Sequence, residues 1–104
     1  MRILMKARLP VERANALASN GTLGKTIAGI LEELKPEAAY FGEENGQRTA
    51  FVIVNIEGAH KIPALAEPWF LAFDASVSLI PVMTSEDLAK AGPDIERAGK
   101  KYRA

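Results

Sequence analysis

Cysteine is absent from this chain of 104 residues, and histidine and tryptophan each occur once, as His60 and Trp69. Without cysteine there is no disulfide framework, no thiolate metal site and no cysteine nucleophile. A single histidine also excludes a multi-histidine metal site within one chain. We therefore expect a protein that uses neither a metal nor another cofactor.

An excess of charge of one sign is also lacking, because 13 basic residues balance 13 acidic ones. No net field favours nucleic acid or an anionic membrane surface. No apolar run reaches the length of a membrane span, and charged residues interrupt the first residues, MRILMKARLPVER, too often for a signal peptide. These absences predict a cytoplasmic protein that binds neither nucleic acid nor membrane.

What is present is typical of one small globular domain, with 48% apolar and 25% charged residues. Alternating apolar positions predict strands at 3–9, 38–42, 48–57 and 75–83. Helical spacing predicts helices that begin near Pro10, Thr22, Ala59 and Thr84. Asn45-Gly46 suits a tight hairpin turn, and Pro81 is tolerated in the last strand only at an edge or a bulge.

The main elements follow the order βαββαβ, which predicts an α+β ferredoxin-like plait. Its four-stranded antiparallel sheet would run fourth, first, third, second strand, with the helices on one face. Gly92-Pro93 is expected to stop the last helix. The prediction is therefore a domain over 1–92 and a polar, basic tail over 93–104.

The segment SNGTLGKT, residues 19–26, ends like the phosphate-binding P-loop G-x-x-x-x-G-K-[ST]. Ser19 stands where the first glycine belongs, and the residues before it favour a helix rather than the strand that a P-loop needs. Gly21 ending one helix and Thr22 capping the next explains the segment without a nucleotide.

The uncovered sheet face is predicted to be apolar at one end and polar at the other. In the third strand Val52 and Val54 would face the helices, whereas Phe51 and Ile53 would face outward. Such an exposed patch favours association with a second copy. We expect a homodimer, or a higher oligomer, in which two sheets close a barrel around a cavity.

At this point the sequence resembles the dimeric α/β-barrel proteins, and in particular small bacterial proteins of the muconolactone isomerase-like type. The segment EPWFLAFDASV, residues 67–77, carries the resemblance, together with the element order over 1–92. The resemblance implies the fold and the dimer. It does not imply an isomerase, because no catalytic residue of that enzyme matches a residue of this chain.

The polar end of the open face is the predicted site. Adjacent first and third strands are expected to bring the cations Lys6 and Arg8 close to Asn55 and Glu57. Glu57 is the candidate base, and the cations and the amide would orient an anionic oxygen. The alternative is a salt bridge at the rim of the dimer interface.

His60 and Tyr40 complete the candidate set. His60 follows the third strand and is a candidate catalytic base, the alternative being a solvated surface histidine. Tyr40 could donate a hydrogen bond to a ligand carbonyl, or simply pack its ring on the sheet. Glu43 and Glu44 are expected to be solvated charges.

Two classes of function follow. The first is a cofactor-independent enzyme or binder, isomerase- or monooxygenase-like, that takes a small apolar or aromatic ligand inside the dimer barrel. The second is a non-catalytic interaction module whose open sheet face is only a dimer interface. Whether a cavity remains in the dimer would distinguish them.

Overall fold

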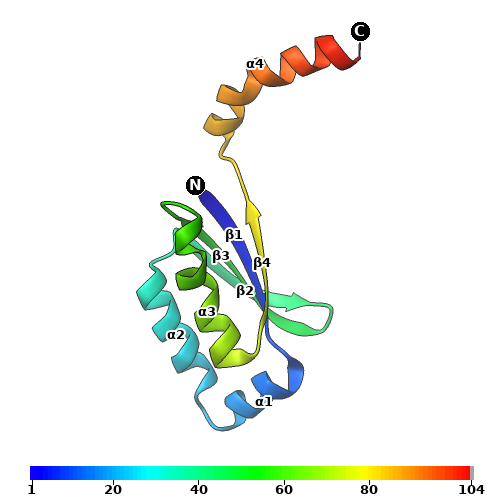
Figure 1. Ribbon diagram of the computed structural model, residues 1–104. Helices are drawn as coiled ribbons and strands as arrows, with labels where there is room; N and C mark the ends of the chain where they lie inside the picture. The colour runs from blue at the N-terminus through cyan, green and yellow to red at the C-terminus, as the bar shows by residue number, and fades with distance from the viewer. Residues whose placement is uncertain (104) are drawn as a thin grey trace.

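The computed structural model describes residues 1–103 (Figure 1). The strands are β1 (Arg2–Arg8), β2 (Ala38–Glu44), β3 (Gln47–Asn55) and β4 (Ser76–Pro81). The helices are α1 (Val11–Ser19), α2 (Leu23–Leu34), α3 (Ile62–Phe73) and α4 (Ser85–Tyr102), with the short 3-10 helix η1 (Ala59–Lys61) before α3. Each predicted strand and helix is present, with ends shifted by a few residues except at the C-terminal end of α4.

The four strands form one antiparallel sheet in the order β2-β3-β1-β4. This is the predicted order, and β4 is an edge strand, as Pro81 required. Figure 1 shows α2 and α3 on one face of the sheet, so the other face is left open. The arrangement is α+β and compatible with a ferredoxin-like fold.

The register separates the two sheet faces cleanly. On the helical side, Met5 of β1 lies between Val52 of β3 and Leu79 of β4. On the open side, Leu4 lies between Ile53 and Ile80. Strand β3 shows the same alternation, because its Val52 and Val54 are buried while its Phe51 and Ile53 are half-buried. The predicted assignment of faces is confirmed.

The core lies between the sheet and α3. Its largest fully buried side chains are Trp69, Phe73, Met5 and Val52. The rings of Trp69 and Phe73, one helical turn apart, lie 5.8 Å apart between centroids at a tilt of 41°, a favourable aromatic arrangement. Of the neighbouring aromatic residues Trp69 and Phe70, Phe70 is 41% exposed, so Trp69 is the one that anchors α3 to the sheet.

The junction of α1 and α2 explains the sequence SNGTLGKT. Gly21 has a φ of +79°, which ends α1 in a conformation that glycine adopts freely. Asn20 then accepts a hydrogen bond through Oδ1 from the Thr22 backbone N–H, at 3.0 Å. Gly24, Lys25 and Thr26 lie in α2, and α1 stands where a P-loop needs a strand.

Helix α4 contradicts one prediction, because it continues through Gly92-Pro93 to Tyr102. Proline inside a helix removes the hydrogen bond to the carbonyl four residues earlier, here that of Ala89. Ala89 is exposed, so water can hydrogen-bond to that carbonyl. No residue of α4 is buried, so no neighbouring element constrains the helix at Pro93. The division between 1–92 and 93–104 stays a prediction, and Ala104 lies outside the described residues.

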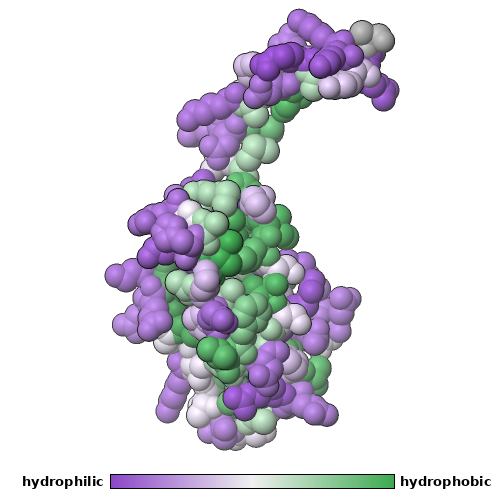
Figure 2. All heavy atoms as spheres, viewed as in Figure 1, coloured by the Kyte–Doolittle hydropathy of each residue, from purple (hydrophilic) through white to green (hydrophobic). Residues whose placement is uncertain are grey.

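The molecule is elongated. Its radius of gyration is 17.4 Å, whereas a compact chain of this length has about 13 Å. Figure 1 shows the reason: α4 projects from the end of β4 and stands apart from the body. None of the residues from Ser85 to Tyr102 is buried. Figure 2 shows hydrophobic residues gathered where α4 joins the body, while most of α4 is polar.

Candidate functional site

The structure does not bring the predicted polar cluster together. Strands β1 and β3 are antiparallel, so Asn55 lies opposite Arg2, whereas Lys6 and Arg8 lie opposite Phe51 and Thr49. The expected placement of Lys6 and Arg8 beside Asn55 and Glu57 is therefore wrong. The polar residues stand at the C-terminal ends of both strands, and the C-terminal ends of antiparallel neighbours lie at opposite ends of the sheet.

Lys6 and Arg8 instead share Glu44, at the end of β2. Glu44 Oε2 lies 2.8 Å from Lys6 Nζ, and Glu44 Oε1 accepts a hydrogen bond of 2.6 Å from Arg8 Nε. The Lys6 ammonium and then the Arg8 guanidinium lower the pKa of the Glu44 carboxyl. All three side chains are between 21% and 29% exposed. Glu44 is thus an ion-pair partner and not a solvated charge.

Asn55, Glu57 and His60 lie at the opposite end of the sheet. Asn55 Oδ1 accepts a hydrogen bond of 2.9 Å from the amino group of Met1. Asn55 and Glu57 also line a shallow pocket of about 280 Å³ with Lys61, between the end of α2 and the start of α3. His60 Nε2 lies 3.8 Å from Glu57 Oε2, but the two side chains are 69% and 80% exposed. Water therefore surrounds both candidate catalytic groups in this chain.

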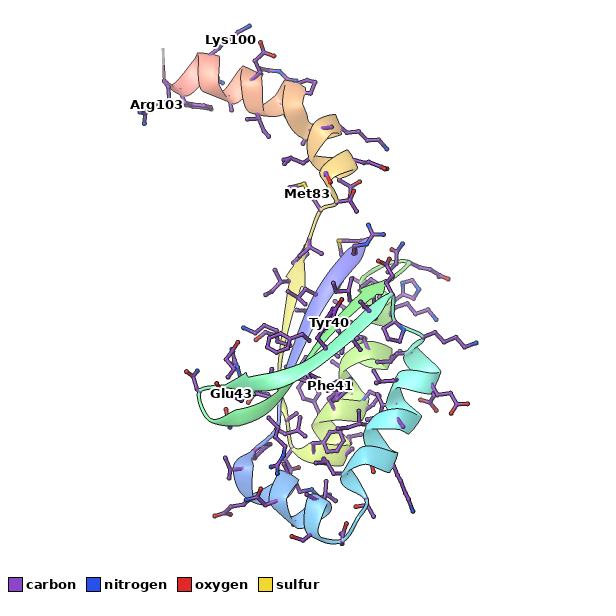
Figure 3. All side chains as sticks on the ribbon, turned by 180° about the vertical axis from the view of Figure 1, so that it is seen from behind. Tyr40, Phe41, Glu43, Met83, Lys100 and Arg103 are labelled. Atoms are coloured by element: carbon purple, nitrogen blue, oxygen red, sulfur yellow. The ribbon has the colours of Figure 1, made fainter. Side chains whose placement is uncertain are left out.

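The open face carries rows of side chains that run across all four strands. One row is entirely apolar and consists of Ala38, Ile53, Leu4 and Ile80, which we call the apolar row. The next row consists of Tyr40, Phe51, Lys6 and Ser78. Tyr40 is 66% exposed and lies on the sheet side seen in Figure 3, opposite the helices. The open face therefore offers one continuous apolar stretch beside the ion pairs of Lys6 and Arg8 with Glu44.

A second hollow lies on the helical side of the sheet. It has a volume of about 370 Å³ and an almost entirely apolar lining that includes Ile27 of α2, Ala50 of β3 and Trp69 of α3. Phe41 and Gly42 of the edge strand β2 and Arg48 of β3 also contribute to it. We call it the Trp69 pocket. No sequence pattern had indicated a cavity on this side.

Glu44 is the residue that the sequence reasoning missed, and a signal for it was present. The turn at Asn45-Gly46 places the end of β2 and the start of β3 together, and the antiparallel order places that end beside the last residues of β1. Glu44 and Arg8 were therefore neighbours by topology alone. Among residues 1–103, no three histidine, aspartate or glutamate side chains are grouped as metal ligands would be.

Two findings complete the description. None of the helices in the described part of the chain combines the length and the apolar character that crossing a membrane requires. Comparison of the chain with protein-family models, with curated proteins and with solved structures finds no match. The resemblance to muconolactone isomerase-like proteins thus has no support beyond the architecture of the sheet and helices.

Proposed function

We propose that the chain acts as a self-associating interaction module. It forms a homodimer through the open sheet face, and α4 of each copy packs against the other copy. In this dimer the two sheets face one another, as in an α/β barrel, and α4 of each copy reaches over to the other copy. The observation that carries the proposal is α4, a long amphipathic helix with no buried residue among Ser85–Tyr102.

The apolar side chains of α4 have a spacing suited to a partner. They recur at intervals of three and four residues, as a helix seam requires, at Leu88, Ala91, Ile95, Ala98 and Tyr102. Leu88, Ile95 and Tyr102 are 50%, 58% and 72% exposed. An isolated helix of 18 residues is only marginally stable in water, and tertiary packing of an apolar face supplies most of the stability of such helices. A second copy provides that packing.

The open face provides the matching surface. The apolar row and the adjacent Tyr40 and Phe51 have no cover, and the cations Lys6 and Arg8 share the single carboxylate of Glu44. A partner that covers this face buries apolar area and meets each cation already in an ion pair, with one net positive charge left over. The extended segment around Met83 joins this sheet directly to α4 (Figure 3). Both unpartnered surfaces therefore belong to one assembly.

The surface area supports the same conclusion. The chain exposes 7000 Å², whereas a compact monomer of 11.2 kDa exposes about 5,700 Å². The excess of about 1,300 Å² per chain falls within the range that obligate homodimers bury. Self-association would bury this excess surface, whereas a monomer would keep it exposed to water.

The experiment is a measurement of molar mass by light scattering on the full chain at micromolar concentration. We expect twice the chain mass of 11.2 kDa, or a higher multiple. Hydrogen exchange then tests the interface, because slow exchange along α4 should be lost on dilution, whereas the central strands β1 and β3 are protected within each chain. A chain that stays at its own mass at 100 μM, with α4 exchanging freely, would refute the proposal.

The second candidate function is a cofactor-independent enzyme or binder with its site inside the dimer barrel, either isomerase- or monooxygenase-like. The half-buried cluster of Lys6, Arg8 and Glu44 beside Tyr40 and Phe51 favours it, since a barrel interior would hold these polar groups next to apolar walls. A dimer structure that shows an enclosed cavity of at least about 300 Å³ at these residues would support this candidate. A filled interface would leave only the interaction module.

A further inference from the structure

The Trp69 pocket exists because small residues meet at one place on the helical side of the sheet. The row that crosses the strands there consists of Phe41, Ala50, Ala7 and Val77. Ala50 and Ala7 are buried side by side and leave room for the large Trp69 ring above the sheet. The remaining volume of about 370 Å³ lies within the range of small-molecule sites.

One polar atom in this apolar region has no partner. Trp69 is 0% exposed, and its Nε1–H finds no hydrogen-bond acceptor among residues 1–103. Buried tryptophan usually has a partner for this group, because an unmade hydrogen bond in a dry interior is unfavourable. Thr49, another pocket residue, uses its hydroxyl to donate to the Gln47 carbonyl, at 3.0 Å. The indole donor therefore lacks an acceptor within the described chain, and because its nitrogen is fully buried, a ligand oxygen reaches it only when a neighbouring side chain of the pocket moves aside.

We propose that the Trp69 pocket binds a small apolar molecule that carries a carbonyl or carboxylate oxygen, and that this oxygen accepts the indole N–H of Trp69. The apolar part of the ligand lies against Ile27 and Ala50. This site is on the opposite side of the sheet from the dimer interface, so it does not depend on the proposed function.

The charge of Arg48 distinguishes a carboxylate oxygen from a neutral carbonyl oxygen as the ligand group. It also lines the pocket, and its Nη1 donates to Asn15 Oδ1 of α1 at 2.8 Å. In the described chain Arg48 forms no salt bridge, because its cross-strand neighbour Glu43 accepts instead from the Gly46 N–H. A cation without a counterion at the pocket favours a carboxylate over a neutral carbonyl.

The test uses the single tryptophan as its own reporter. With 15N labelling, the indole N–H of Trp69 gives one isolated cross-peak. We would titrate the full chain with three probes of one shape: 4-phenylbutyrate, the neutral 4-phenylbutanamide and the hydrocarbon butylbenzene. The two oxygen-bearing probes should shift the indole proton downfield, and butylbenzene should not. If Arg48 contributes, phenylbutyrate binds more tightly than the amide, and Arg48→Gln removes that difference.

Two substitutions, measured by calorimetry, distinguish the contribution of the indole donor to binding from that of the pocket volume. Trp69→Phe should weaken the binding of the oxygen-bearing probes by about threefold to tenfold and leave that of butylbenzene nearly unchanged. Ala50→Leu should fill the pocket and abolish the binding of all three probes. Ala89→Leu, on α4 and outside the pocket, is the matched control and should bind like the unmodified chain.

Because Ala50 is buried, Ile27→Phe serves as a second blocking variant on a half-buried helix position. Binding that survives in both blocking variants overturns the proposal. It is equally overturned if the indole cross-peak of the unmodified chain does not move with any of the probes at millimolar concentration, or moves equally with butylbenzene.

Discussion

Replacing Ile95 by serine tests whether the apolar seam of α4 packs in the working protein. Ile95 is 58% exposed in the single chain, and full burial of an isoleucine side chain stabilises by about 1.5–3 kcal/mol. Burying the exposed part therefore contributes roughly 1–2 kcal/mol, and a symmetric dimer loses this contribution twice. Since each 1.4 kcal/mol changes affinity tenfold, Ile95→Ser should raise the dimer Kd by about 30-fold to 700-fold.

The assay is sedimentation velocity over a concentration series, with Lys90→Ser as the matched control. Lys90 lies on the opposite side of α4, and serine has the same helix propensity at both positions. The control should keep the Kd of the unmodified chain within about twofold. Because no residue of α4 belongs to the core, Ile95→Ser should still melt cooperatively. Equal dissociation constants for the two variants would refute the packing of α4 against a second copy.

Three further predictions concern other parts of the chain. Phe51→Lys should separate the dimer because it places an unpaired charge in the apolar centre of the open face, whereas Leu71→Lys, at a site 78% exposed on α3, should not; light scattering distinguishes them. Lys6 and Arg8 hold the pKa of Glu44 below its ordinary value of 4.5, so the stability from this cluster is present above pH 4.5 and is lost as the pH falls through the lowered value. Thermal melts from pH 6 to 3 should therefore show the unmodified chain losing its advantage over Glu44→Gln, and a constant difference would contradict the ion-pair role. Thr84→Ala should destabilise the first turn of α4 by about 1 kcal/mol, because Thr84 Oγ1 accepts a hydrogen bond from the Asp87 N–H at 3.1 Å. The expected result is faster amide exchange in that turn alone. Unchanged exchange there would count against the cap.

The fold followed from the sequence because its signals are local and mutually consistent. Alternation in β1 and β3, the Asn45-Gly46 turn with both φ angles positive, and Pro81 at an edge each depend on a few neighbouring residues. The end of α4 could not be predicted in this way. A Gly-Pro pair usually stops a helix, and its tolerance here depends on solvent around Ala89, which is a property of the tertiary structure.

The candidate site was less accessible from the sequence. Alternation placed Lys6, Arg8, Asn55 and Phe51 correctly on the open face, but their distances along it depend on strand direction and register. Once the antiparallel register is known, Glu44 becomes the partner of the two cations and Asn55 the partner of the Met1 amino group. The hollow beside Trp69 depends on the small side chains of Ala50 and Ala7 lying side by side, and no single segment of the sequence encodes that pairing.

Pro81 limits how far these molecules can add to one another by strand pairing. Strand β4 ends in a residue without a backbone N–H, and the next N–H, that of Val82, already donates to the Arg2 carbonyl at 3.1 Å. Pro81 thus offers a foreign strand no donor at the end of this edge, whereas β2, with Phe41 55% exposed beside it, keeps an unpaired edge throughout. Growth of an extended cross-strand ladder needs two receptive edges on each molecule. Because Pro81 weakens one end of the β4 edge, strand addition under heat stress should occur mainly through β2, and discrete pairs of sheets should form more readily than fibrils.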